Sequence, residues 1–120
     1  MAEQIQYTLK HVGLNAPDSQ GAQELTQALC HLFHQEVTMD GPASLFTPLF
    51  EIMKFHDREK RGAFGHIGLV TPDVEAAMAD LASKGITFQE DSIRRDKAGT
   101  ITFVYLEQQI GGFSFHISNN

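Results

Sequence analysis

The sequence predicts an α+β domain made of two copies of one βαβββ module. Two observations lead to this fold class: a stretch near the start of the chain recurs 55 residues later, and each half holds one amphipathic helix pattern among several short strand patterns. A length of 120 residues allows one domain and leaves no room for a second independent one. We therefore expect a single domain over residues 1–120, with modules at about 5–56 and 63–118.

The repeat is clearest at the start of each module. Residues 11–18 (HVGLNAPD) and 66–73 (HIGLVTPD) are identical at five of eight positions. Later in each module, residues 49–52 (LFEI) match 114–117 (SFHI) at a spacing of 65 residues. The second module must therefore hold additional residues between its two matches, and we place them around residues 93–99.

The first module reads as a strand, a helix and three further strands. The helix is assigned because its apolar residues recur at three- and four-residue spacing. Gly41 followed by Pro42 predicts the turn between the second and third strands. A charged linker, residues 56–62, follows the module. In chain order, the expected elements occupy residues 7–15, 18–34 (the helix), 36–39, 44–47 and 49–55.

The second module repeats this order, so that the two modules form two small sheets. Thr71 is expected to cap the helix, with Pro72 at the first helical position, where a missing N–H is harmless. Gly85 is expected to end that helix. The strands are expected at residues 64–70, 87–90, 100–106 and 113–117.

Composition and charge exclude several classes of protein. A hydrophobic content of 42% with 20% charged residues is typical of a globular domain and excludes a disordered chain. A net charge of −6 argues against nucleic acid or an anionic membrane as a partner. The single cysteine, Cys30, cannot form an intrachain disulfide and fits a reducing compartment. No secretory signal pattern is visible, so we expect a cytoplasmic protein with a small-molecule substrate.

Four residues with metal-binding chemistry stand at equivalent places in the two modules. His11 and His66 lie in the first strand of each module, and Glu51 and His116 lie in the last. Three imidazoles and one carboxylate suit a divalent ion of zinc, nickel, cobalt, manganese or iron. Glu51 lies among apolar residues, where a buried carboxylate is costly unless it is paired or ligating. We therefore predict that these four residues bind one divalent ion, with two coordination positions left for water or substrate.

The motifs in this order resemble those of the vicinal oxygen chelate superfamily, which includes glyoxalases, bleomycin-resistance proteins and extradiol dioxygenases. The resemblance implies a glyoxalase-like fold, in which the two modules form an incomplete eight-stranded barrel. It also implies that each module supplies one metal ligand from its first strand and one from its last. The last ligand of that family is most often Glu, and here it is His116. The motifs are residues 10–14 (KHVGL), 50–52 (FEI), 65–69 (GHIGL) and 111–117 (GGFSFHI).

The resemblance implies a metal-dependent lyase or isomerase with Glu51 as the catalytic base. Zinc or nickel is expected ahead of manganese, cobalt or iron. The motifs are closest to small chelate-fold proteins associated with keto-deoxy-phosphogluconate aldolases, which suggests a keto acid or sugar acid as the substrate. Two alternatives stay open: a non-catalytic small-molecule binding domain, and an extradiol-type dioxygenase, against which the fourth ligand His116 argues.

Five further residues are expected at the substrate pocket. Glyoxalases carry an Arg four residues after the first-strand ligand, whereas this chain has Asn15, so glutathione is not the expected substrate. Arg94 belongs to a basic run that could bind a carboxylate or a phosphate. Met53, Phe103 and Tyr105 are expected to line the pocket.

The short connection between the modules predicts a homodimer. It favours modules that lie side by side at their edges, which would leave an apolar concave face uncovered. We therefore expect each metal site to combine His11 and Glu51 of one chain with His66 and His116 of its partner.

Overall fold

A computed structural model describes residues 4–54 and 62–120, so the linker predicted at 56–62 lies, except for Gly62, outside the described residues. Both βαβββ modules are present. The first consists of β1 (Thr8–Asn15), α1 (Ser19–Phe33), β2 (Met39–Asp40), β3 (Ser44–Phe46) and β4 (Phe50–Met53). The second consists of β5 (Gly65–Val70), α3 (Val74–Ser83), β6 (Phe88–Arg95), β7 (Ile101–Leu106) and β8 (Phe113–Ser118). Neither helix is long and apolar enough to cross a membrane.

The start of α3 and the length of β6 differ from the predictions. Asp73, and not Thr71, caps the helix, because its carboxylate accepts a hydrogen bond of 3.0 Å from the backbone N–H of Ala76. Thr71 still belongs to the extended chain that leaves β5 and is fully buried. Strand β6 runs to Arg95 instead of ending at residue 90. The longer strand therefore takes up part of the insertion expected around 93–99.

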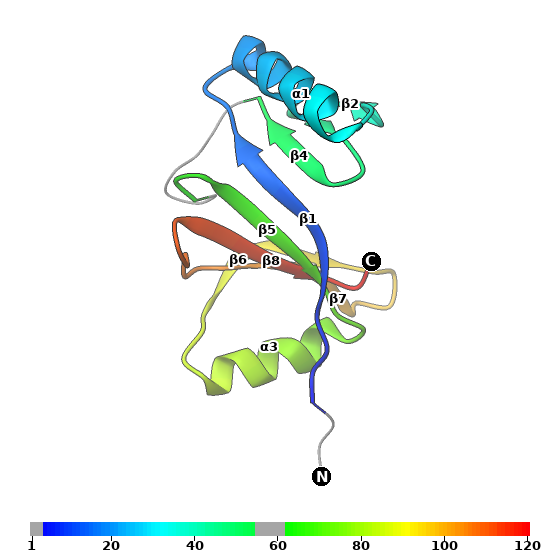
Figure 1. Cartoon of the computed structure of the whole chain (residues 1–120). Helices are drawn as coiled ribbons and strands as arrows, with labels where there is room; N and C mark the ends of the chain where they lie inside the picture. The colour runs from blue at the N-terminus through cyan, green and yellow to red at the C-terminus, as the bar shows by residue number, and fades with distance from the viewer. Residues whose placement is uncertain (1–3, 55–61) are drawn as a thin grey trace.

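The strands of both modules form one eight-stranded sheet that is not closed into a barrel, in the order β2-β3-β4-β1-β5-β8-β7-β6. The prediction of two separate small sheets is therefore wrong. The first strands of the modules pair antiparallel, with Val12 opposite Ile67, and this pairing joins the two halves at the centre. Figure 1 shows β1 running through the middle, with α1 and α3 at opposite ends of a molecule of 47 × 28 × 27 Å.

Each module has its own small hydrophobic core beneath its helix. Ile52 of β4 belongs to the core beneath α1, and Ile117 of β8 belongs to the core beneath α3. Because side chains alternate along a strand, the neighbouring Glu51 and His116 lie on the opposite face of the sheet. The helices thus cover one face of each half and leave the other face free for the predicted ligands.

Candidate metal centre

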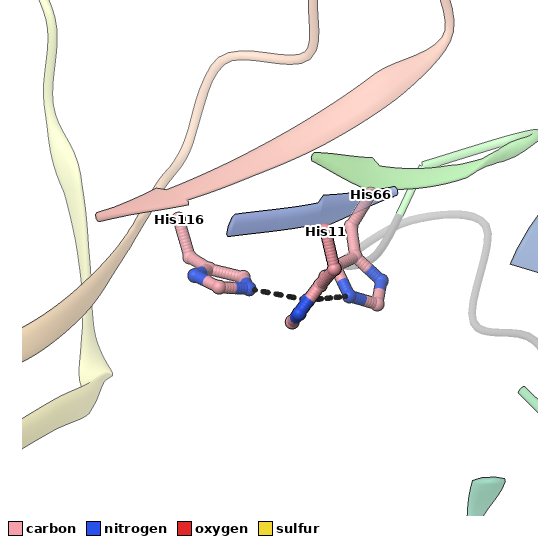
Figure 2. Close-up of side chains that lie close together, drawn as sticks. All are labelled: His11, His66 and His116. Carbon is pink, nitrogen blue, oxygen red and sulfur yellow. Dashed lines mark hydrogen bonds between the residues drawn. The ribbon is translucent and has the colours of Figure 1, made fainter. Parts of the chain in front are cut away.

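The structure brings all four predicted metal ligands together on the four central strands. The Nε2 atom of His11 lies 3.0 Å from Nε2 of His66 and 3.2 Å from Nε2 of His116. The Oε1 atom of Glu51 lies 3.0 Å from Nε2 of His66 and 3.4 Å from Nε2 of His11. In Figure 2 the three imidazoles project from three neighbouring strands to the same side of the sheet.

Two glycines make this convergence possible. In the strand pairing, Gly13 stands between Glu51 and His66, and Gly68 stands between His11 and His116. A Cβ atom at Gly13 would coincide with the imidazole of His66. A Cβ atom at Gly68 would lie 2.8 Å from Nε2 of His116 and 3.2 Å from Nε2 of His11. The glycine two residues after each repeated histidine therefore leaves the space that the rings of the other strands occupy.

The four candidate ligands lie together within a single chain, whereas the sequence led us to expect that each site combines ligands of two chains. The reason is the antiparallel pairing of β1 with β5, which places Gly68 opposite His11 and Gly13 opposite His66. The two histidines are therefore diagonal neighbours on one face of the sheet. No partner chain is needed to complete the cluster, and the homodimer itself stays a prediction.

The arrangement of these donor atoms fits a divalent ion. Neighbouring ligands about 2.1 Å from a metal stand about 3.0 Å apart in an octahedral site and about 3.4 Å apart in a tetrahedral one. Nε2 of His11 lies 3.0, 3.2 and 3.4 Å from the donor atoms of His66, His116 and Glu51, and these distances span the two values. Nε2 of His11 faces two other ring nitrogens, and two lone pairs that face each other repel unless a proton or a cation lies between them. The residues present therefore suit a metal such as zinc or nickel.

Burial keeps two of the imidazoles neutral. Burial, together with the neighbouring His66, lowers the pKa of His11 below its usual value of 6.5. Burial and the other two imidazoles lower the pKa of His116 to about 3. A neutral imidazole has the free lone pair that metal coordination needs. Both side chains are therefore ready to bind a cation at neutral pH.

Glu51 is held as a carboxylate in this cluster. Burial alone would raise its pKa, but the hydrogen bonds from His66 and Ser44 and the electrostatic attraction of the His66 and His11 rings outweigh burial and lower the pKa. Ser44 donates from Oγ to Oε2 of Glu51 at 2.8 Å, which leaves Oε1 to face the imidazoles. Ser44 is not predictable as a site residue from the sequence, because only the pairing of β3 with β4 brings it to Glu51.

The cluster lies against a pocket of about 530 Å³. Arg94, Phe103 and Tyr105 line it, as predicted from the sequence. The other lining residues that matter for its chemistry are Lys10 and the ligands His11, Glu51 and His116, together with the aromatic side chains of Phe46 and Phe50.

Asn15 and Met53 do not line this pocket, so their predicted role in substrate binding is not supported. They pair with each other at the end of β1 and β4, beyond the ligand positions. Asn15 donates from Nδ2 to the backbone carbonyl of Gly62 at 2.9 Å, at the start of the second module. Its side chain therefore connects the two modules and does not point at a ligand.

Comparisons with known proteins identify the fold. The sequence matches no protein-family model and no curated protein. A methylmalonyl-CoA epimerase variant of Streptomyces coelicolor, in complex with 2-nitronate-propionyl-CoA, has a TM-score of 0.61 and 16% identity over 92% of each chain. The methylmalonyl-CoA epimerase of Mycobacterium tuberculosis has a TM-score of 0.64 and 15% identity over 92% of this chain and 85% of its own. A hypothetical protein of Bacillus halodurans has a TM-score of 0.65 and 13% identity over 94% of each chain.

At these identities the likeness is one of fold. It covers nearly the whole chain and therefore both modules. The suggested association with keto-deoxy-phosphogluconate aldolases stays a prediction. The chain has the glyoxalase-like fold that its resemblance to the vicinal oxygen chelate superfamily implied.

Proposed function

We propose that the protein is a metal-dependent isomerase that moves a proton on a carbon next to a carbonyl group of a small keto acid or sugar acid. One observation carries this proposal: beside a pocket of about 530 Å³, Nε2 of His11 lies 3.0 to 3.4 Å from the ring nitrogens of His66 and His116 and from a carboxylate oxygen of Glu51. Two of the solved structures with this fold are epimerases by name, which is a class of isomerase.

The metal ion would be held by the four residues His11, Glu51, His66 and His116. When bound, it supplies a Lewis acid that stabilises the negative charge developing on two adjacent substrate oxygens. The position of His116, 3.2 Å from His11, favours this four-ligand set over the two histidines and one carboxylate of an extradiol dioxygenase.

Glu51 would act as the catalytic base. Its lowered pKa keeps it deprotonated at neutral pH, as a proton acceptor must be. The hydrogen bond from Ser44 fixes Oε2, so that Oε1 stays directed at the cluster. Glu51 also lines the pocket, where it can take a proton from a bound acid and return it to the same molecule. The aromatic walls of the pocket reduce the access of water to this step.

Proton exchange into heavy water tests this function directly. Metal-loaded protein is incubated in D₂O with a panel of keto acids and sugar acids, and with methylmalonyl-CoA as a thioester probe. Loss of the proton signal next to the carbonyl is followed by ¹H NMR. We expect at least one acid to exchange in a metal-dependent way, and Glu51→Gln to lower the rate by about 100-fold or more.

Glu24→Gln serves as the matched control, because Glu24 is an exposed carboxylate on α1. It should exchange at the wild-type rate. Binding of one ion per chain without exchange of any probe would contradict an isomerase and favour the non-catalytic binding domain.

A further inference from the structure

We propose that the pocket selects a small acid with a second anionic group, and that Arg94 binds this group. The inference rests on the proposed function, because it places the reacting end of the acid at the four-ligand cluster. The chain has 15 acidic and 9 basic residues, yet the described residues of the pocket include two cations, Lys10 and Arg94, and only one carboxylate, Glu51. With a divalent ion at Glu51, the pocket would be positively charged in an acidic protein.

Arg94 is the pocket cation whose hydrogen-bond donors are all available for a ligand, whereas Lys10 already uses one of its donors within the chain. The ammonium group of Lys10 donates to the backbone carbonyl of Asn120 at 2.7 Å. The guanidinium carbon of Arg94 lies 4.8 Å from the ring centre of Phe103, and the guanidinium has no carboxylate or carbonyl partner among the described residues. A cation over a ring is oriented by the ring and keeps its N–H edges free for hydrogen bonds.

Phe103 connects Arg94 to the ligand cluster. The ring of Phe103 is 4.7 Å from the ring of His116, at an interplanar angle of 35°. The two steps of 4.8 and 4.7 Å place the guanidinium no more than 9.5 Å from the ring centre of His116. A short acid that reaches the cluster with one end can therefore reach Arg94 with the other.

The backbone of β6 is irregular at this position. The register of β6 against β7 shifts on both sides of Arg94, which pairs with Phe103, while the next residue, Arg95, pairs with Ile101. Such irregularities turn a side chain in a new direction and are frequent next to active sites. Arg95 is used differently, because its Nη1 donates to the carbonyl of Gly99 at 2.9 Å. The chain thus offers two adjacent arginines, one open to the pocket and one bound to its own turn.

The expected substrate is therefore a 2-oxo or 2-hydroxy acid with a carboxylate or phosphate at its far end. A guanidinium binds either group through two parallel charge-assisted hydrogen bonds. A neutral far end of the same size would offer Arg94 an uncharged acceptor, and the hydrogen bonds to the guanidinium would be weaker. Recognition of the far end is thus separable from chelation at the cluster.

Isothermal titration of metal-loaded protein with three probes tests this inference. The probes share the 2-oxo acid end and differ only at the far end: 2-oxoglutarate, its neutral 5-(N,N-dimethyl)amide, which has no N–H with which to cyclise onto the ketone, and 4-phosphono-2-oxobutanoate. We expect at least one anionic probe to bind about tenfold or more tightly than the amide. The tighter of the two anionic probes shows whether a carboxylate or a phosphate is the natural group.

The adjacent arginines provide the matched variants. The preference is the dissociation constant for the amide divided by that for the anionic probe. Arg94→Gln should lower this ratio to about one. Arg94→Lys should give a ratio between one and the wild-type value, because it keeps the charge but not the two parallel hydrogen bonds. Arg95→Gln should keep the wild-type ratio. Circular dichroism and metal content are measured on the same samples to show that each variant is folded and loaded.

The outcomes separate this inference from the proposed function. A wild type that binds one ion per chain but binds the amide as tightly as both anionic probes overturns the role of Arg94 and leaves the isomerase standing. Equal losses in Arg94→Gln and Arg95→Gln would also overturn it, since they would show a general effect of surface charge. A wild type that binds no ion overturns the proposed function, and the inference with it.

Discussion

Acid should destabilise the metal-free protein, and His116 should account for a measurable share of the loss. Burial and the neighbouring imidazoles lower the pKa of His116 from 6.5 to about 3. Below pH 6.5 the unfolded chain takes up a proton on this residue, whereas the folded chain stays neutral until about pH 3. The unfolded state then binds more protons, so the free energy of unfolding falls as the pH falls between these two values.

The size of the effect follows from the width of this interval. Each pH unit below 6.5 lowers the free energy of unfolding by about 1.4 kcal/mol. At pH 5 the share of His116 is therefore about 2 kcal/mol, a large part of the roughly 5–15 kcal/mol that stabilises a typical domain. His11, whose pKa is also lowered by burial, acts in the same direction. The lowered pKa of Glu51 adds a further loss once the pH falls below about 4.5.

Urea unfolding in the presence of EDTA measures this contribution. The free energies of unfolding of the wild type and of His116→Gln are compared at pH 7.5 and pH 5. The wild type should lose about 2 kcal/mol more than the variant between these two pH values, because glutamine takes up no proton. An equal loss in both proteins would refute the reasoning and would show that His116 is solvated, or protonated, in the folded state.

Three further predictions follow from the cluster and its supports. Gly13→Ala should lower metal affinity by about 10- to 100-fold, measured by competition with a chelator, because the new Cβ displaces the ring of His66. Gly85→Ala, whose new Cβ meets no atom within 4 Å, is the control and should bind the metal as the wild type does. Asn15→Ala should lower the free energy of unfolding by about 1–2 kcal/mol, because it removes the hydrogen bond to the buried carbonyl of Gly62. The metal content should stay at one ion per chain, and a loss of metal would contradict a purely structural role of Asn15. Mixing the variants His11→Ala and His66→Ala after reversible denaturation should restore no metal binding. The candidate ligands lie together within one chain, so every site in the mixture still lacks one histidine. Recovery at one site per heterodimer would instead support sites shared between chains.

The modules and the candidate ligands were predictable from sequence because their signals are local. The match of residues 11–18 with 66–73 predicted two related modules, and the comparison with solved structures confirms the fold. The alternation of side chains along a strand placed Glu51 next to Ile52 and His116 next to Ile117, with opposite faces for ligand and core. The spacing of histidine and glycine in each repeat was also visible, although its steric meaning was not.

The tertiary structure decided what depends on contacts between distant segments. The antiparallel register of β1 with β5 places His11 and His66 side by side in one chain, and a strand pattern carries no information about its pairing partner. The same limit applies to Ser44, which reaches Glu51 only through the pairing of β3 with β4. Strand pairing also brings Arg94 to the pocket and takes Asn15 away from it, although both were equally plausible as substrate residues in the sequence. Local patterns predict which residues share a face of a strand, whereas the register between strands decides which of those faces meet.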